Sequence, residues 1–279
     1  MTPAAETRVF GMAGCGAMGL PMAERLCDAG FEVWGFDVRP VAEFGTFAPR
    51  MIADPAAFAA QVDCVFSVVR DRRQTMDLCF DQQAIFSVER PPDTLVVCST
   101  LSPRVIPEVA AKLPAGTDLL DAPMSGAPHR ARNGTLTFMV GGDTASVDDL
   151  ARPFEAMGER IHHLGERGAG MTVKVINNFV ATSSVVAVRR AMGAAAALGV
   201  ERETLLDVMR TSSGGTWYGD HFDDIDWARE GYDPENTMGI LEKDMTSFLD
   251  ALEATDGLAA GPFEDAVLQS IRRTEPIGS

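Results

Sequence analysis

The sequence predicts an α/β domain built on a doubly wound parallel sheet, followed by an all-helical C-terminal domain. Two observations support this order. In the first half, short apolar segments alternate with segments of helical periodicity, which is typical of a parallel sheet with helices on its faces. In the second half, helical segments follow one another, and we expect no strand after Gly142. The 279 residues are enough for two domains.

Six segments have the length and apolar content of strands. They are residues 8–14, 32–38, 63–69, 95–98, 117–121 and 135–141. Residues 18–29 have helical periodicity and end at Gly30, a residue type that commonly terminates helices. The chain is therefore expected to begin with a strand–helix–strand unit.

The second half begins with residues 169–198, a proline-free segment rich in Ala, Val and Met. Its length predicts a long, mostly buried helix between the two domains. Three more segments are expected to be helical, at residues 203–210, 238–254 and 262–273. We place the domain boundary near residue 163, with an α/β domain at 1–163 and a helical domain at 164–279.

Composition excludes several classes of partner. The net charge of −16 argues against binding to nucleic acid or to an anionic membrane surface. We see no signal peptide at the start of the sequence and no apolar stretch that approaches the length of a membrane span. The five cysteines form no CxxC pair and are expected to be reduced thiols. We therefore expect a cytoplasmic protein. No metal site is expected, because the histidines lack the spacing of metal ligands.

The loop after the first strand carries the strongest motif. Residues Gly14-Cys15-Gly16-Ala17-Met18-Gly19 fit the pattern GxGxxG between a strand and a helix. Gly14 would make the tight turn, Gly16 would let the backbone approach a pyrophosphate, and Gly19 would allow the helix to pack closely on the strand. The helix N-terminus would add unpaired N–H groups for the phosphates. The loop predicts dinucleotide binding by a Rossmann-type domain.

An acidic residue follows at the expected place. Asp37 closes the second strand, 18 residues after Gly19, where a carboxylate can accept hydrogen bonds from the adenosine ribose hydroxyls. It would also repel a 2′-phosphate, which favours NAD. Arg39 could instead pair with that phosphate, so NADP remains an alternative.

Several further motifs occur in a familiar order. They are residues 99–103 (Ser-Thr-Leu-Ser-Pro), 121–126 (Asp-Ala-Pro-Met-Ser-Gly), 134–142, 168–178 and 243–244 (Lys-Asp). Together with the glycine loop, they make the chain resemble the β-hydroxyacid dehydrogenases over nearly its whole length. That resemblance implies hydride transfer between a small β-hydroxyacid and NAD(P).

The resemblance implies that Lys174 is the acid–base group. Oxidation of an alcohol needs a base for the hydroxyl proton, and a lysine can serve where burial or nearby positive charge brings its pKa toward neutrality. Val173 and Val175 flank Lys174, which suits partial burial. Asn178 follows four residues later, on the same face of a helix, and would orient substrate or lysine.

The same resemblance assigns binding residues. Ser125 and Gly126 would hold the substrate carboxylate, because small residues let a planar anion come close to the main chain. Val68, Thr100 and Lys243 would lie on the cofactor side.

The chain departs from the family pattern in the substrate loop, where two usual glycines are replaced by Ala127 and Arg130. Ala127 keeps its N–H, so it can still help to bind a carboxylate. We hypothesise that Arg130 or His129 meets a second polar or anionic group of the substrate; the alternative is that both point to solvent.

Three functions remain open from sequence. The leading one is an NAD-dependent β-hydroxyacid dehydrogenase. The first alternative is an NADPH-dependent reductase of small aldehyde acids, such as glyoxylate or succinic semialdehyde. The second is an NAD(P)-binding module without turnover, against which Lys174 argues. By resemblance, the partners are further copies of the chain, as a homo-dimer or homo-tetramer.

Overall fold

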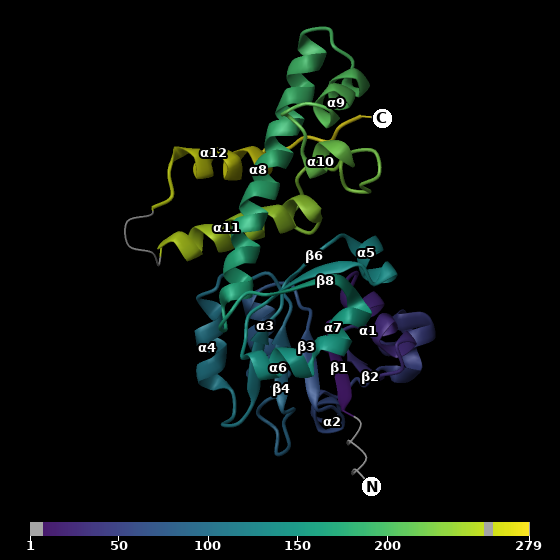
Figure 1. Cartoon of the computed structure of the whole chain (residues 1–279). Coiled ribbons are helices and arrows are strands. Elements are labelled where there is room, and N and C mark those ends of the chain that lie inside the picture. Colours follow the sequence, from purple (N-terminus) through teal and green to yellow (C-terminus); the bar gives the residue numbers. More distant parts are fainter. Residues whose placement is uncertain (1–7, 254–258, 279) are drawn as a thin grey trace. The chain divides into compact units, whose positions relative to one another are not determined.

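The computed structural model describes residues 8–253 and 259–278 (Figure 1). Internal contacts divide the chain into a first unit, Met1–Lys174, and a second unit, Val175–Ser279. The division falls inside one helix, α8 (Ala169–Ala197). The domain boundary near residue 163 stays a prediction.

The first unit contains a five-stranded parallel sheet. Its strands are β1 (Val9–Ala13), β2 (Glu32–Phe36), β3 (Cys64–Ser67), β4 (Thr94–Val97) and β5 (Asp118–Asp121). Their order is β2-β1-β3-β4-β5, with every neighbouring pair parallel. The chain thus winds one way from β1 to β2 and the other way from β3 to β5. This confirms the doubly wound sheet, and β1 marks the switch point where ligands of such sheets bind.

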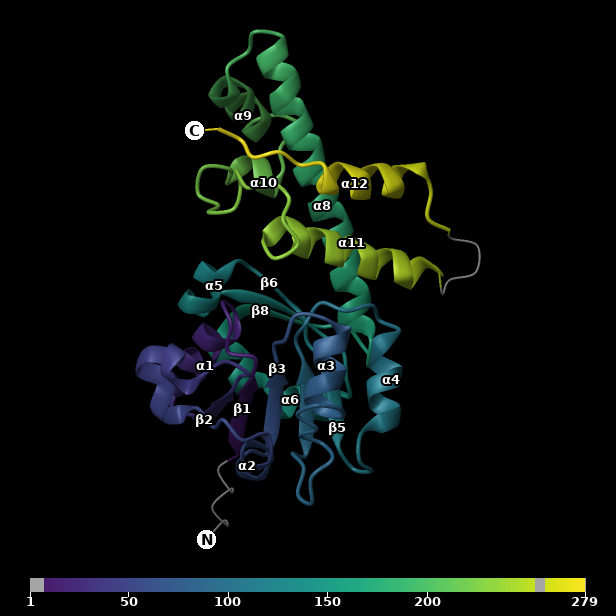
Figure 2. The same cartoon turned by 180° about the vertical axis from the view of Figure 1, so that it is seen from behind.

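Helices cover both faces of this sheet (Figures 1 and 2). One face packs against α1 (Gly19–Asp28), α6 (Thr144–Asp149) and α7 (Ala151–Met157), and the other against α2 (Pro55–Gln61), α3 (Arg72–Cys79) and α4 (Val105–Lys112). The side chains alternate accordingly: in β4, Val96 joins the first core cluster, whereas Leu95 and Val97 join the second. A 3₁₀ segment, η1 (Val41–Arg50), follows β2.

A second, three-stranded sheet lies in the same unit. It consists of β6 (Met124–Ser125), β7 (Leu136–Val140) and β8 (Gly158–His163), and α5 (Pro128–Asn133) connects β6 to β7. The strand expected at residues 135–141 therefore exists as β7 but belongs to this sheet. The expectation of no strand after Gly142 is wrong, because β8 follows it. Four of the six residues of β8 are exposed, so the strand lacks the apolar signature of a buried one.

The second unit is helical, as predicted. After the main part of α8 come α9 (Arg202–Arg210), α10 (Trp217–Asp220), α11 (Thr237–Glu253) and α12 (Pro262–Arg272). The helices expected at 203–210, 238–254 and 262–273 are confirmed within one residue at each described end; residue 254 lies outside the described residues. Helices α11 and α12 run side by side against α8 through Phe248 and Val267, which pack with Val175 (Figure 1).

Helix α8 corrects one expectation about membranes. By length and composition alone, α8 could cross a bilayer. This differs from the expectation that no apolar stretch of the sequence approaches the length of a membrane span. The core helix of a soluble protein passes the same test, so this is weak evidence.

Candidate active site

The glycine loop has the geometry that its motif predicts. Gly14 follows β1 with a φ of +92°, and a Cβ there would lie 2.5 Å from the carbonyl oxygen of Val68. A Cβ at Gly19 would lie 2.0 Å from the carbonyl oxygen of Gly14. Neither position can take a larger residue without moving backbone. The loop is thereby packed against Val68, the predicted cofactor residue after β3.

Gly16 differs from these two glycines. A Cβ built on Gly16 meets no atom within 4 Å, so it borders open space. Helix α1 begins just beyond, with no acidic residue in its first turn and no hydrogen-bonding side chain as its N-cap among the described residues. An open cradle beside the first N–H groups of a helix fits a pyrophosphate. The loop thus fits a dinucleotide, with Ala17 and Met18 at the entry to α1.

We expect Gly16→Ala to weaken binding of NADH by about tenfold or more, because a methyl group would enter the space of the phosphates at a cost of about 1–3 kcal/mol. Unfolding free energy should change by less than about 0.5 kcal/mol, since the methyl meets no protein atom. Fluorescence titration and thermal unfolding measure the two effects.

Gly193→Ala is the matched control for this substitution. Gly193 lies in α8 and likewise has no atom near its built Cβ, so the change should leave NADH affinity unaltered. An equal affinity for NADH in Gly16→Ala and the unchanged protein would remove the loop from the cofactor site.

Asp37 and Arg39 form one unit at the end of β2. Asp37 Oδ1 accepts hydrogen bonds from the backbone N–H and from Nε of Arg39, each at 3.0 Å. Asp37 Oδ2 accepts from Nη2 of Arg39 at 3.1 Å and from the backbone N–H of Cys15 at 2.9 Å. Burial opposes ionisation of Asp37, but these donors outweigh it and hold the pKa of the carboxyl below its ordinary value.

The four donors have a consequence for the cofactor. A carboxylate offers about four acceptor positions, so those of Asp37 are all taken. Nη2 of Arg39 also donates to the carbonyl of Cys15 at 2.9 Å. A ribose hydroxyl can reach Asp37 only where the Arg39 side chain gives up its place.

Three more of the predicted residues, Val68, Thr100 and Ser125, come after the carboxyl ends of parallel strands. Val68 follows β3, Thr100 follows β4, and Asp121 ends β5 and begins the loop to Ser125. The Ser99 hydroxyl donates to the carbonyl of Val69 at 2.7 Å, which ties the ends of β3 and β4 together. These three strand ends lie at the same edge of the sheet as the ends of β1 and β2, which carry the glycine loop and Asp37, and ligands of doubly wound sheets bind at this edge.

The substrate loop shows why its departures from the family pattern are tolerated. Gly126 has a φ of +134° and requires glycine, since a Cβ would come within 3.0 Å of both Arg130 and Leu136. Ala127 has φ −67° and ψ 172°, ordinary extended angles that accept a Cβ. The N–H groups of the loop are therefore arranged without strain at residue 127.

Arg130 lies on α5, which begins directly after Ala127. The aliphatic part of its side chain packs against Gly126, and its Nη2 forms an ion pair with Oε1 of Glu159 on β8 at 2.8 Å. His129 on the same helix is exposed.

Lys174 lies in the second turn of α8 and is 6% exposed. At the start of this helix, the backbone N–H groups of Gly168, just before it, and of Met171, in its first turn, donate to the carboxylate of Asp121. Asn178 lies one turn beyond Lys174 on the same helix, as expected from sequence.

In the second unit, a buried carboxylate joins two of the predicted residues. Asp244 on α11 is 4% exposed; it accepts from Nδ2 of Asn178 at 2.6 Å and pairs with Nζ of Lys243 at 2.7 Å. The sequence motif predicts a role for Lys243 but indicates none for Asp244. The missing signal is tertiary, because Asp244 and Asn178 are 66 residues apart.

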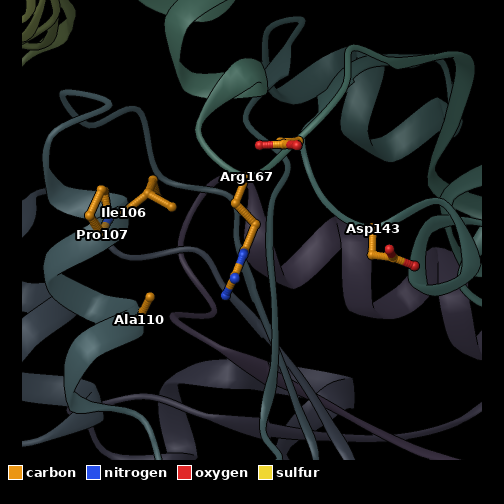
Figure 3. A pocket seen from close by; sticks show the side chains of 6 residues that line it. Ile106, Pro107, Ala110, Asp143 and Arg167 are labelled. Carbon is orange, nitrogen blue, oxygen red and sulfur yellow. The ribbon is translucent and has the colours of Figure 1, made fainter.

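Figure 3 shows a pocket of the first unit in which the Arg167 side chain extends beside α4. Its lining residues are Ile106, Pro107, Ala110, Asp143, Glu166 and Arg167. None of them is a residue that the sequence singled out.

Known families match both halves of the chain. The family model of the NAD-binding domain of 6-phosphogluconate dehydrogenase matches residues 9–165. A second model, described as the NAD-binding region of NADP-dependent 3-hydroxyisobutyrate dehydrogenase, matches residues 168–273. The two matches cover the parallel sheet and the helical unit in turn.

Individual proteins are similar over most of the chain. An NAD-dependent L-serine dehydrogenase of Pseudomonas aeruginosa is 37% identical over 73% of this chain and 70% of its own length. The L-threonate dehydrogenase of Escherichia coli K12 is 31% identical over 88% of this chain and 82% of its own. A crystal structure of a Salmonella typhimurium 3-hydroxyisobutyrate dehydrogenase superposes with a TM-score of 0.80 at 27% identity, covering 95% of this chain and 93% of that one.

Proposed function

Since this chain belongs to the β-hydroxyacid dehydrogenase family, we propose that it oxidises a small β-hydroxyacid to its semialdehyde or ketoacid with Lys174 as the base. The chain is an NAD(P)-dependent oxidoreductase. The observation that supports this proposal most strongly is the position of Lys174. It is buried on α8, and the start of this helix is hydrogen-bonded to Asp121, at the end of the strand that leads to Ser125.

The chain's own residues divide the work. The loop from Gly14 to Gly19 and the start of α1 would hold the pyrophosphate of the cofactor. The hydroxyl of Ser125 and the N–H groups after it hold the substrate carboxylate. The cofactor, when bound, supplies the hydride acceptor.

Lys174 handles the proton. As a neutral amine it accepts the proton of the β-hydroxyl, while the C–H bond electrons leave the carbinol carbon and C=O forms. In the reverse direction the lysine ammonium returns that proton to the carbonyl oxygen. Asp244 orients Asn178, because the side-chain amide of Asn178 donates to this buried carboxylate. The carbonyl oxygen of Asn178 accepts from Nδ2 of Asn177 at 3.1 Å and keeps a second acceptor position for a hydroxyl or an ammonium.

The proposed substrate class is a short acid with a hydroxyl on the β-carbon. L-serine, L-threonate and 3-hydroxyisobutyrate, the compounds in the names of the similar proteins, all have this arrangement. NAD is the proposed cofactor, because a carboxylate at the end of β2, Asp37, would repel a 2′-phosphate. The second candidate is the reduction of small aldehyde acids with NADPH. The position of Arg39 beside Asp37 favours NADPH, because the guanidinium could pair with its 2′-phosphate.

The test is an absorbance assay of reduced nicotinamide. Purified protein is mixed with each of the three acids, with NAD⁺ and NADP⁺ in parallel, and the reverse reaction is run with glyoxylate and succinic semialdehyde. We expect turnover of at least one β-hydroxyacid with preference for NAD⁺. Binding of NADH without turnover of any compound would support the non-catalytic module instead.

Arg130 is proposed to contact a second polar group of the substrate. Arg130→Ala should then raise the KM for the preferred acid by about tenfold, the loss expected for one hydrogen bond to a charged group. Glu159→Gln is the matched control, because it breaks the ion pair with Arg130 but leaves the guanidinium in place. An equal rise in KM for both variants, or none for Arg130→Ala, would show that Arg130 only supports the loop.

We also propose that the chain forms a homo-dimer or homo-tetramer in the cytoplasm. Ile176 and Val180 on α8 are 50% and 61% exposed, which is compatible with a covering copy of the chain. Light scattering of the purified protein measures the stoichiometry, and a monomer at micromolar concentration would contradict it.

A further inference from the structure

Asp121 is a fully buried carboxylate to which no role has yet been given. It ends β5 and has no exposed surface. Its Oδ1 accepts from the backbone N–H of Gly168 at 2.6 Å, and its Oδ2 accepts from that of Met171 at 2.7 Å. Burial raises the pKa of this carboxyl, while the surrounding backbone N–H groups oppose the rise. With both oxygens accepting, the arrangement suits the charged form at the positive end of a helix.

The packing around this carboxylate leaves little freedom. A Cβ at Gly141 would lie 2.5 Å from Oδ1, and one at Gly170 would lie 2.9 Å from Oδ2 and 2.2 Å from the carbonyl of Met139. The backbone of Asp121 also exchanges two hydrogen bonds with Gly141, at 2.8 and 3.0 Å. Two glycines thus let the start of α8 approach the end of β5 closely.

This cap differs from the others in the same unit. Helices α2, α3 and α6 are each capped by the aspartate that directly precedes them, namely Asp54, Asp71 and Asp143. The cap of α8 comes from a strand 47 residues earlier in the chain. A local aspartate would stabilise the helix end equally well, so a distant one adds something more: it fixes where α8 starts relative to β5.

Two functional segments depend on that position. Lys174 lies one turn beyond Met171, and Ser125 lies four residues beyond Asp121. We propose that Asp121 is a positioning residue that sets the location of Lys174 relative to the Ser125–Gly126 loop. The inference rests on the proposed function, in which these two groups act on the same substrate. All the contacts that carry it lie within the first unit.

The experiment compares Asp121→Asn with Asp54→Asn in the full chain. Asn has the same shape as Asp but leaves one amide NH₂ facing a backbone N–H. We expect kcat to fall by about 10–100-fold, as for a misplacement of about 1 Å, with NAD⁺ affinity unchanged because the glycine loop is untouched. Asp54→Asn makes the same change at the cap of α2 and should leave kcat within about twofold, since it changes no group near the substrate loop.

A double-mutant cycle separates positioning from a general structural effect. If Asp121 acts through Lys174, adding Asp121→Asn to Lys174→Ala should slow the residual reaction no further. An equal slowing in both backgrounds, or a normal kcat in Asp121→Asn, would overturn the inference while leaving the proposed function intact. Full activity of Lys174→Ala would instead overturn the proposed function.

A second variant covers the case in which Asp121→Asn fails to fold. Gly170→Ala keeps the carboxylate but pushes the first turn of α8 away from it. We expect the same fall in kcat and the same lack of effect in the Lys174→Ala background; normal turnover in a folded Gly170→Ala protein would contradict the inference.

Discussion

Lys174→Ala is expected to lower kcat/KM for the preferred hydroxyacid by about 10²–10⁴-fold, the usual contribution of a positioned general base. The side chain is buried at the second turn of α8 and no other lysine lies in that helix. Binding of NADH should be unchanged, because the glycine loop and Asp37 are unaltered. Steady-state rates measured by absorbance, with NADH titration by fluorescence, check both parts.

Two variants sharpen this prediction. Lys174→Arg keeps a positive charge but cannot release a proton at neutral pH, so it should be as slow as alanine in the oxidation. Lys112→Ala removes an exposed lysine of α4 in the same unit and should leave the rate unchanged. A kcat/KM within twofold of the unchanged protein in Lys174→Ala would assign the proton transfer to another group.

Asp37→Asn is expected to shift the cofactor preference toward NADP⁺ by about 10–100-fold, through loss of the ribose acceptor and of the repulsion of a 2′-phosphate. In the unchanged protein, the Arg39 side chain donates to both carboxylate oxygens of Asp37, and the same substitution releases it. A freed guanidinium can pair with the phosphate. The measurement is the ratio of kcat/KM for the two cofactors with one saturating acid.

The reciprocal variant moves the ratio the other way. Arg39→Ala frees for the ribose hydroxyls the two acceptor positions of Asp37 that the Arg39 side chain occupies, and it removes the partner of a 2′-phosphate. The two backbone N–H donors to Asp37 remain. We expect NAD⁺ to bind more tightly. Glu43→Gln is the control, since it removes an exposed negative charge near Arg39 but leaves both Asp37 and Arg39 in place. A ratio unmoved in both Asp37→Asn and Arg39→Ala would place cofactor choice elsewhere in the chain.

The main sheet could be predicted because its signals are local. Each of its strands contains a short apolar run. The glycine pattern of the first turn has a steric cause, because a Cβ at Gly14 or Gly19 would clash with a backbone oxygen. The long helix α8 was equally visible, as a proline-free run of helical length. The strand β8 was missed because its exposed, charged residues resemble a loop, and only its pairing with β7 makes it a strand.

The candidate site shows the same limit. Sequence spacing and family resemblance named Lys174, Asn178 and Ser125, but the carboxylates that bond to their surroundings were not recognised. Asp121 bonds to groups 47 and 50 residues away, and Asp244 to one 66 residues away. Such contacts exist only after folding. The same holds for Arg39. Its side chain is held in place to bond to Asp37 only because η1 and the glycine loop lie close together in the folded chain.

The measurement that tests the central claim most directly follows the hydrogen of the carbinol carbon. The acid identified by the absorbance assay is prepared with deuterium at that carbon and oxidised with NAD⁺, and the product NADH is examined by mass spectrometry. The account predicts that the deuterium appears in NADH and that the reaction is slower than with the unlabelled acid. Deuterium that appears in water, with unlabelled NADH, would contradict direct hydride transfer and with it the assignment of Lys174 as the partner base.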